Sequence, residues 1–152
     1  DSIGKQGTLI MFICNHCPFV KYINNELVAI ANKYLNKGIG FIAINSNDTI
    51  NYPGDAPLEM IKTAKANNYP FPYLFDESQE VAKAYDAACT PDFYLFNDQL
   101  RLVYRGQLDS SRPGNNIRIT GTDLRQGIDH LMNNTLQQVV QKPSMGCNIK
   151  WK

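Results

Sequence analysis

Apolar and polar residues follow two different periods along the chain, and these periods predict strands and helices in turn. A continuous apolar run over residues 8–13 predicts a strand that is buried on both faces. From Phe19 onward apolar residues recur every three or four positions, which predicts an amphipathic helix that ends near residues 37–38, a lysine and a glycine. A second apolar run over residues 39–45 predicts another buried strand.

The middle of the chain continues the alternation after a polar loop. Apolar positions within residues 58–64 predict a shorter helix, and residues 72–76 predict a strand or an extended segment. Either Asp76 or Ser78 is suited to cap a helix over residues 78–88, because both side chains can accept a backbone N–H.

The last third predicts a hairpin followed by a helix. Residues 92–96 and 101–105 alternate as paired strands do, and a loop over residues 106–121 follows them. The final amphipathic helix is predicted from Leu124, Ile128, Leu131 or Met132, Leu136 and Val139. The tail over residues 141–152 has no usable period. The whole order predicts an α/β fold with a mixed central sheet flanked by helices.

Composition narrows the class of protein. The chain has 152 residues, 43% of them hydrophobic, so we expect one domain over residues 1–152. The net charge of +1 comes from dispersed basic residues, which argues against a nucleic-acid partner. No apolar run is long enough to span a membrane, and no signal peptide is visible. We therefore expect a cytoplasmic protein, or a periplasmic or secreted one if a leader preceding Asp1 has been removed.

Two of the four cysteines, Cys14 and Cys17, lie at the junction between the first strand and the first helix. Unpaired N–H groups and the helix dipole stabilise a thiolate at a helix N-terminus. The two-residue separation also lets the sulfurs form a reversible disulfide. His16, when protonated, would stabilise the thiolate further, and Pro18 suits the first helical turn. This context favours a redox-active pair.

Other interpretations of these residues stay open. Cysteine is a common core residue, so Cys14 and Cys17 would also fit simple packing. A structural zinc site more often shows two close pairs, whereas Cys89 and Cys147 are distant singles, so we expect no metal. His16 equally fits an exposed first-turn residue with no catalytic duty.

Thr90 and Pro91 form a second candidate region. Pro91 directly precedes a predicted strand, so it is either a turn proline or a cis proline. A cis peptide would leave the backbone of Thr90 free to face a neighbouring loop. Asp109 and Arg112 lie on a loop long enough to reach the site, but a surface ion pair is the favoured interpretation.

Six stretches of the sequence resemble a known family. They are "MFICNHCPFVK", "AINSND", "FPYLFDESQEVAKAY", "CTPDFYLF", "YRGQLD" with the following "SRPG", and "PSMGCNIKWK". With them the chain resembles the thioredoxin-like superfamily. Within that superfamily it is similar to peroxiredoxin-like, AhpC/TSA-related redoxins that carry a CxxC motif and a further cysteine near the C-terminus.

The resemblance implies a thioredoxin-like fold, with an additional strand region that would precede Asp1. It implies that Cys14 attacks a substrate disulfide and that Cys17 resolves the mixed disulfide. It also implies that Thr90 and Pro91 form a cis-proline loop against the CxxC motif. Cys89 would then lie near the pair, either as a third redox partner or as a buried small residue.

Cys147 would resolve an oxidised Cys14 or Cys17 by folding over the site, or would pair with another subunit, or would have no role. The sequence departs from thioredoxins at Ile13, where they carry a tryptophan, and at Asn15 and His16, where they carry glycine and proline. The resembling peroxiredoxins carry a threonine at the position of Cys14 and an activating arginine that has no evident counterpart here.

Three functions follow. The favoured one is a thiol–disulfide oxidoreductase that acts on protein or small thiol and disulfide substrates, with the Cys14–Cys17 disulfide as its redox group and no separate cofactor. The first alternative is an antioxidant hydroperoxide reductase in which Cys17 is oxidised to a sulfenic acid and Cys14 resolves it. The second alternative is a non-catalytic thioredoxin-fold binding module whose CxxC motif holds a metal or packs in the core.

Overall fold

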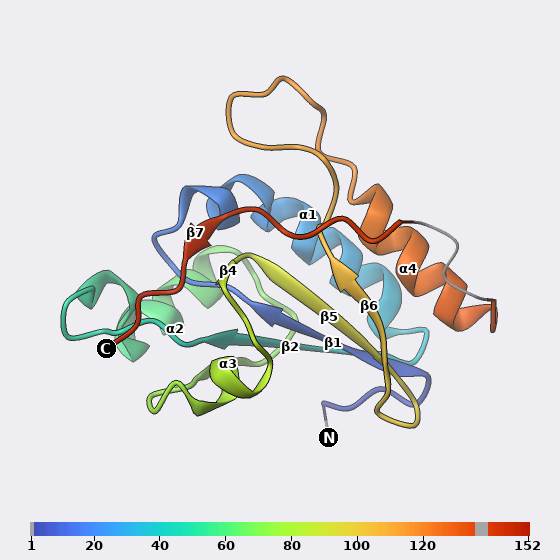
Figure 1. The fold of residues 1–152 in the computed structure, drawn as a ribbon, viewed down its shortest axis with the longest axis horizontal. Helices are drawn as coiled ribbons and strands as arrows, with labels where there is room; N and C mark the ends of the chain where they lie inside the picture. The colour runs from blue at the N-terminus through green and yellow to red at the C-terminus, as the bar shows by residue number, and fades with distance from the viewer. Residues whose placement is uncertain (1, 136–139) are drawn as a thin grey trace.

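The computed structural model describes residues 2–135 and 140–152 and contains a five-stranded mixed sheet. Its strands stand in the order β3-β2-β1-β5-β6 (Figure 1). Strands β1, β2 and β3 run parallel, whereas β5 is antiparallel to both β1 and β6. The bounds are β1 Gly7–Phe12, β2 Ile39–Asn45, β3 Tyr73–Phe75, β5 Asp92–Asn97 and β6 Leu102–Gly106. The mixed sheet flanked by helices confirms the predicted α/β fold class.

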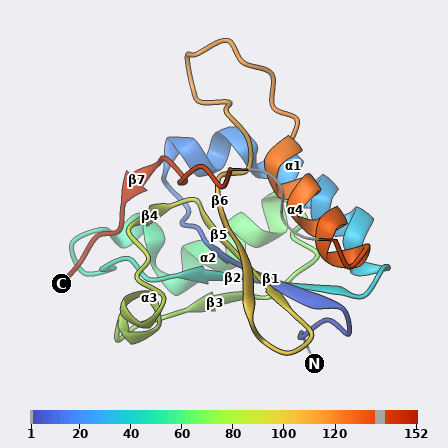
Figure 2. The ribbon, with the colours of Figure 1, turned by 45° about the vertical axis from the view of Figure 1, so that its right-hand side comes forward.

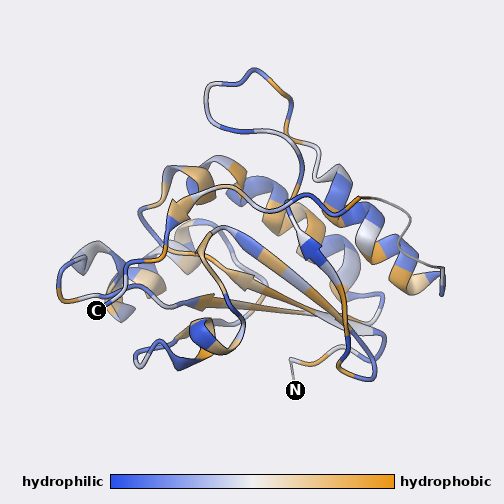
Figure 3. Cartoon of the chain, in the orientation of Figure 1, coloured by the Kyte–Doolittle hydropathy of each residue, from blue (hydrophilic) through white to orange (hydrophobic). Residues whose placement is uncertain are grey.

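Strand β1 is the centre of the sheet and is buried on both faces. Leu9 and Met11, with Ile13 just after the strand, contribute to one apolar cluster, and Ile10 and Phe12 contribute to the other. This arrangement explains why the sequence there is continuously apolar instead of alternating. Figure 3 shows the same contrast between apolar central strands and polar outer segments.

Helices cover both faces of the sheet. Helices α1 (Pro18–Leu35) and α4 (Thr122–Met132) pack on the face of Leu9 and Met11. The short helix α3 (Glu80–Ala84) packs on the opposite face through Ala82. Between β2 and β3 lie the 3₁₀ turn η1 (Pro53–Asp55) and helix α2 (Pro57–Ala66).

Helix α3 is shorter than the predicted span of residues 78–88. Gln79 and Asp86 adopt left-handed backbone conformations, with φ of 63° and 54°, and these conformations bound the helix at both ends. The carboxylate of Asp76 accepts the backbone N–H groups of Val81 and Ala82, as its predicted capping role requires.

The loop between β6 and α4 is present as predicted, whereas α4 is shorter than the helix that the spacing predicts. The loop that joins β6 to α4 projects away from the sheet, as the two views show (Figures 1 and 2). Helix α4 ends at Met132. Leu136 and Val139, which the spacing places in this helix, lie outside the described residues.

The C-terminal tail forms a structural element that the sequence pattern does not predict. Strand β7 (Cys147–Asn148) pairs antiparallel with β4 (Cys89–Thr90), so that Thr90 stands opposite Cys147. Beyond β7, the N–H of Ile149 donates to the Ala88 carbonyl at 3.1 Å. These contacts fix the tail to β4. In Figure 1 the tail passes over α1 before it reaches β7.

In the described parts of the chain, no helix combines the length and the apolar character needed to cross a membrane.

Gly146 is expected to be essential for the position of the tail. A Cβ at this residue would overlap the carbonyl oxygen of Thr90. We expect Gly146→Ala to lower the free energy of unfolding by about 1–3 kcal/mol, the usual cost of overpacking, as measured by urea denaturation. Gly54→Ala is the matched control, because a Cβ there has open space. Equal stabilities of the two variants would contradict a close fit of the tail at Gly146.

Candidate active site

The CxxC motif lies where β1 gives way to α1, as predicted. Cys14 follows the strand, and Cys17 is the N-cap of the helix with an extended backbone (φ −65°, ψ 122°). Pro18 occupies the first helical turn, where its missing N–H leaves no backbone bond unmade. The Cys17 carbonyl accepts the N–H groups of Val20 and Lys21 at 3.1 and 3.0 Å. The Cys17 thiol therefore lies at the positive end of the helix dipole.

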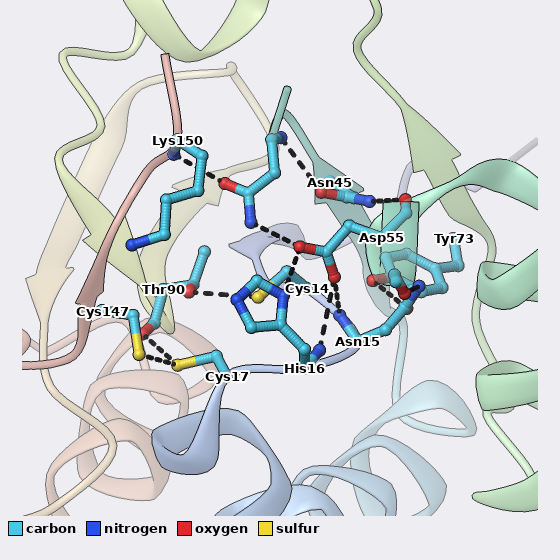
Figure 4. Close-up of polar contacts among 12 residues, drawn as sticks. Cys14, Asn15, His16, Cys17, Asn45, Asp55, Tyr73, Thr90, Cys147 and Lys150 are labelled. Carbon is cyan, nitrogen blue, oxygen red and sulfur yellow. Dashed lines mark hydrogen bonds and ion pairs between the residues drawn. The ribbon is translucent and has the colours of Figure 1, made fainter. Parts of the chain in front are cut away.

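The structure brings a third sulfur to this pair. The Sγ atoms of Cys17 and Cys147 are 2.8 Å apart, although the two residues are separated by 130 positions in the chain (Figure 4). The tail strand β7 holds Cys147 opposite Thr90 in the β4–β7 ladder. A residue of the tail, which shows no period in the sequence, is thereby placed in the centre of the site.

The Thr90–Pro91 peptide bond is cis and lies against the two cysteines of the motif. The Thr90 hydroxyl oxygen is 3.5 Å from Cys14 Sγ, and the Thr90 carbonyl oxygen is 3.3 Å from Cys17 Sγ. Thr90 thus contacts both sulfurs through different atoms. The predicted proximity of this loop to the CxxC motif is present in the structure.

The three clustered thiols differ strongly in acidity. A hydrogen bond from the Cys14 thiol lowers the pKa of Cys17 to about 4, and hydrogen bonds from Cys147 and Thr90 also contribute, against the opposing effect of burial. That same hydrogen bond to Cys17, together with burial and the nearby Asp55 carboxylate, raises the pKa of Cys14. Burial, and then the hydrogen bond to Cys17 and its charge, raise the pKa of Cys147 to about 11. These shifts favour a thiolate on Cys17 over one on Cys14 or Cys147.

Asp55 is a functional candidate that the sequence interpretation missed. Its carboxylate is fully buried and lies 2.5 Å from Nδ1 of His16, whose side chain is 39% exposed. One carboxylate oxygen accepts the backbone N–H groups of Asn15 and His16 at 2.8 and 3.3 Å, and the other accepts the Asn47 amide at 2.9 Å. Asp55 therefore fixes both the backbone between the two cysteines and the imidazole (Figure 4).

A signal for Asp55 was present in the sequence. Its turn follows β2, and the carboxyl ends of β1 and β2 lie at one edge of the sheet because the two strands are parallel. An acidic residue in the loop after the second strand is therefore a candidate neighbour of a cysteine after the first strand.

The His16 side chain is partly exposed but is held by two specific contacts. Besides its contact with the Asp55 carboxylate, its ring stacks on Tyr52, with centroids 6.1 Å apart and an interplanar angle of 7°.

Asn15, the other residue between the two cysteines, is also held on both sides. It donates from its amide to the Gly54 carbonyl at 3.0 Å and accepts from the Tyr73 hydroxyl at 2.9 Å. The Asn45 amide donates to the Asp55 carbonyl at 2.8 Å. These bonds connect the CxxC turn to the loop after β2 and to β3.

Cys89 lies beside the cis-proline loop, and its half-buried sulfur contacts carbonyl oxygens. These are the carbonyls of Pro91 at 3.7 Å and Ser144 at 3.8 Å. Burial and the nearby Asp92 carboxylate raise the pKa of Cys89 to about 11. Its expected position near the pair is present, and its raised pKa and contacts with carbonyl oxygens favour a small half-buried residue over a third redox partner.

The predicted surface ion pair between Asp109 and Arg112 is wrong. Asp109 is 4% exposed, and its carboxylate accepts backbone N–H groups of Ser111, Thr120 and Gly121. The Arg112 guanidinium donates instead to the backbone carbonyl of Asp109 at 2.7 Å. The carboxylate faces its own loop because several N–H donors converge there, so its role is to shape that loop.

Cys14, His16 and Asp55 place one potential metal-ligand atom each within 4.8 Å of one another. Sulfur, imidazole nitrogen and carboxylate oxygen are a donor set that suits zinc. The set does not include Cys17, so it differs from a metal held by the CxxC pair. The Asp55 oxygens already accept the hydrogen bonds described above, and a metal would compete with them.

The strand order, the helices on both faces and the CxxC motif at the start of α1 define a thioredoxin-like α/β protein. A thioredoxin-like protein solved in its oxidised form shares this fold, with a TM-score of 0.68, 18% identity, and coverage of 88% of this chain and 82% of that one. The AhpC/TSA family model matches residues 1–105, and the chain belongs to the AhpC/TSA family. Family and fold support a redox function.

Two further solved structures are similar to the chain. An uncharacterized conserved protein from Geobacillus kaustophilus has 58% identity and a TM-score of 0.97, covering 100% of this chain and 80% of that one. A secreted Mycobacterium tuberculosis disulfide oxidoreductase has 15% identity and a TM-score of 0.59, with 84% coverage of both chains. The second likeness shows the fold alone. No curated protein matches the sequence significantly.

We expect Asp55→Asn to destabilise the fold. The NH2 group of the new amide would face N–H groups whose hydrogen bonds a carboxylate oxygen now accepts. The free energy of unfolding should fall by roughly 1–3 kcal/mol, the cost of buried polar groups left unsatisfied, as measured by urea denaturation. Asp98→Asn, at an exposed position in the β5–β6 turn, is the control and should have little effect. An Asp55→Asn variant as stable as this control would contradict the anchoring role.

Proposed function

We propose that the protein is a thiol–disulfide oxidoreductase whose reacting groups are Cys14 and Cys17. The observation that carries this proposal is the pair of buried thiols at the start of α1, each in contact with Thr90 of the cis-proline loop. The lowered pKa of Cys17 supports it. In the oxidising direction for the protein, a thiolate attacks a substrate disulfide and releases one substrate thiol. A neighbouring thiolate then breaks the mixed disulfide and releases the second substrate thiol, which leaves a Cys14–Cys17 disulfide. Two electrons pass to the substrate.

His16, Thr90 and Pro91 are proposed as the groups that support this pair. The Thr90 hydroxyl and carbonyl contact one sulfur each, so they restrict where the sulfurs lie. His16 is fixed by Asp55 beside Cys14, where a protonated imidazole would favour a thiolate. The substrates we propose are protein or small-molecule disulfides and thiols, with no cofactor beyond the disulfide itself. The cytoplasmic location stays a prediction.

The order in which the two sulfurs act is part of the proposal. The resemblance implies attack by Cys14 and resolution by Cys17. Since the thiolate is the nucleophile, the lowered pKa of Cys17 favours the reverse order. Both orders end in the same Cys14–Cys17 disulfide, and they differ in which cysteine carries the mixed disulfide.

Hydroperoxide reduction is the second candidate, and the acidified Cys17 favours it specifically. Its thiolate would attack the peroxide oxygen, giving a Cys17 sulfenic acid and an alcohol or water. The Cys14 thiol would then condense with the sulfenic acid, forming the disulfide and releasing water. Membership of the AhpC/TSA family also supports this chemistry. Trapping of a sulfenic acid on Cys17 with dimedone during peroxide turnover would distinguish this function from exchange.

We expect both Cys14→Ser and Cys17→Ser to abolish catalytic disulfide reduction, measured with insulin and dithiothreitol. Each variant removes one of the two sulfurs that the catalytic disulfide needs. Cys89→Ser is the matched control, because it removes a half-buried thiol next to the same loop and should keep the wild-type rate. Undiminished reduction by either CxxC variant would disprove the proposal.

We expect alkylation of Cys17 by iodoacetamide to depend on pH with a midpoint far below the ordinary thiol pKa of 9.0. A lowered pKa means that the thiolate persists as the pH falls, so the rate constant should change little between pH 9 and pH 6. Cys147→Ala should raise the midpoint, because it removes a hydrogen-bond partner that lowers the pKa of Cys17, whereas Cys89→Ser should leave it unchanged. A wild-type midpoint in the ordinary range would contradict the charge on Cys17.

A further inference from the structure

Cys147 is placed for chemistry with Cys17 and not merely near it. Their sulfurs are 2.8 Å apart, closer than the 3.3 Å between Cys17 Sγ and the Thr90 carbonyl oxygen. Cys17 is thus the central sulfur of three, because it shares the CxxC turn and the Thr90 contact with Cys14 and also touches Cys147. A central sulfur with two sulfur neighbours is able to form a disulfide with either of them.

The backbone fixes this position from several directions. Cys147 stands opposite Thr90 in the β4–β7 ladder. Further along the tail, the Lys150 N–H donates to the Asn47 side chain at 2.9 Å, and the Lys150 carbonyl accepts from the Gln79 amide at 2.8 Å. The absence of a Cβ at Gly146 lets the tail approach the Thr90 carbonyl. The pairing of β7 with β4 therefore sets the contact between the sulfurs of Cys17 and Cys147.

Cys147 is more exposed to solvent than the other two cysteines of the cluster. Cys14 is 1% exposed and Cys17 is 0% exposed, so a bulky partner cannot reach a disulfide between them without movement of the chain. Cys147 is only partly buried. A disulfide that includes Cys147 would have one sulfur accessible from outside.

We propose that Cys147 is a third redox-active thiol that transfers the disulfide from the Cys14–Cys17 pair to a Cys17–Cys147 pair. This inference rests on the proposed function. In the step, the Cys147 thiolate attacks Sγ of Cys17, the Cys14–Cys17 bond breaks, and the Cys17–Cys147 bond forms. Cys14 leaves as a thiolate and takes up the proton that Cys147 lost. The step transfers no net electrons, so it needs no further oxidant or reductant.

The charges around Cys147 favour this step once the Cys14–Cys17 disulfide has formed. In the dithiol state burial raises the Cys147 pKa, and the hydrogen bond to Cys17 and the charge on Cys17 raise it further. Oxidation of Cys14 and Cys17 to a disulfide removes that charge, while the nearby Lys150 continues to favour a Cys147 thiolate. Cys147 thus becomes a better nucleophile once its target disulfide exists.

The partner class that follows is a dithiol reductant. One of its thiolates would attack Sγ of Cys147 in the Cys17–Cys147 disulfide, releasing the Cys17 thiolate and forming a mixed disulfide on Cys147. The second thiol of the reductant would then attack the reductant's first sulfur in that mixed disulfide, which releases the Cys147 thiol. The reductant leaves as a disulfide, and the protein regains two electrons.

The test maps the disulfides of the full chain. The protein is oxidised with oxidised glutathione, quenched in acid, blocked with N-ethylmaleimide, and digested with trypsin without reduction. Cys14 and Cys17 share the peptide of residues 6–21, and Cys147 lies in the peptide of residues 126–150, because the Lys142–Pro143 bond resists trypsin. We expect wild-type protein to give the linked pair of peptides through Cys17, as well as the internally closed peptide.

Variants make the expected result specific. Cys14→Ser should give the linked peptides as the main product, Cys147→Ser only the closed peptide, and Cys17→Ser neither of these products. Cys89→Ser, which removes the cysteine of the strand paired with β7, should match the wild type. If Cys147 is fully alkylated in both the oxidised wild type and the oxidised Cys14→Ser variant, the inference is overturned.

The outcome is separable from that of the proposed function. If the closed Cys14–Cys17 peptide forms and insulin reduction is normal while Cys147 stays alkylated, the exchange function stands and the transfer fails. If linked peptides form but Cys14→Ser and Cys17→Ser still reduce insulin, the proposed function fails. The wild-type map needs no substitution, so a variant that fails to fold leaves the result decisive.

Discussion

The buried carboxylate of Asp55 is the contact on which the geometry of the site depends. It connects the turn after β2 to the turn after β1, because the same group accepts the N–H groups of Asn15 and His16 and pairs with the imidazole. Charged acceptors make stronger hydrogen bonds than neutral ones, and burial makes their loss costly. The backbone between the two cysteines therefore has a fixed conformation, and α1 begins in a fixed place relative to β4.

The electrostatics of the cluster follow from this placement. The hydrogen bond to Cys17 and burial raise the pKa of Cys14, and the nearby Asp55 carboxylate raises it further. Two thiol neighbours lower the pKa of Cys17, which lies at the start of α1. One negative charge is thus directed to the sulfur that has a neighbour on each side. An asymmetric pair of this kind has a defined starting state for exchange, which two equivalent thiols would lack.

The sequence predicted the features that depend on local patterns. Continuous apolar runs identified β1 and β2, and the change of period after Pro18 placed Cys17 at the start of a helix. What it missed depends on distant contacts. Strand β7 has two residues and thus no period, so only its pairing with β4 defines it. Asp55 is a polar residue in a polar loop, and its burial is set by N–H donors from another segment.

The separation of Cys17 and Cys147 by 130 positions links redox chemistry to the folded state. A Cys14–Cys17 disulfide closes a very small loop and constrains the unfolded chain little. A Cys17–Cys147 disulfide would close most of the chain, and the loop-entropy cost imposed on the unfolded state would be roughly 4–5 kcal/mol. Only the paired tail brings these sulfurs together without that cost. The balance between the two disulfides would therefore measure how firmly the tail is docked, and unfolding would shift it toward the smaller loop.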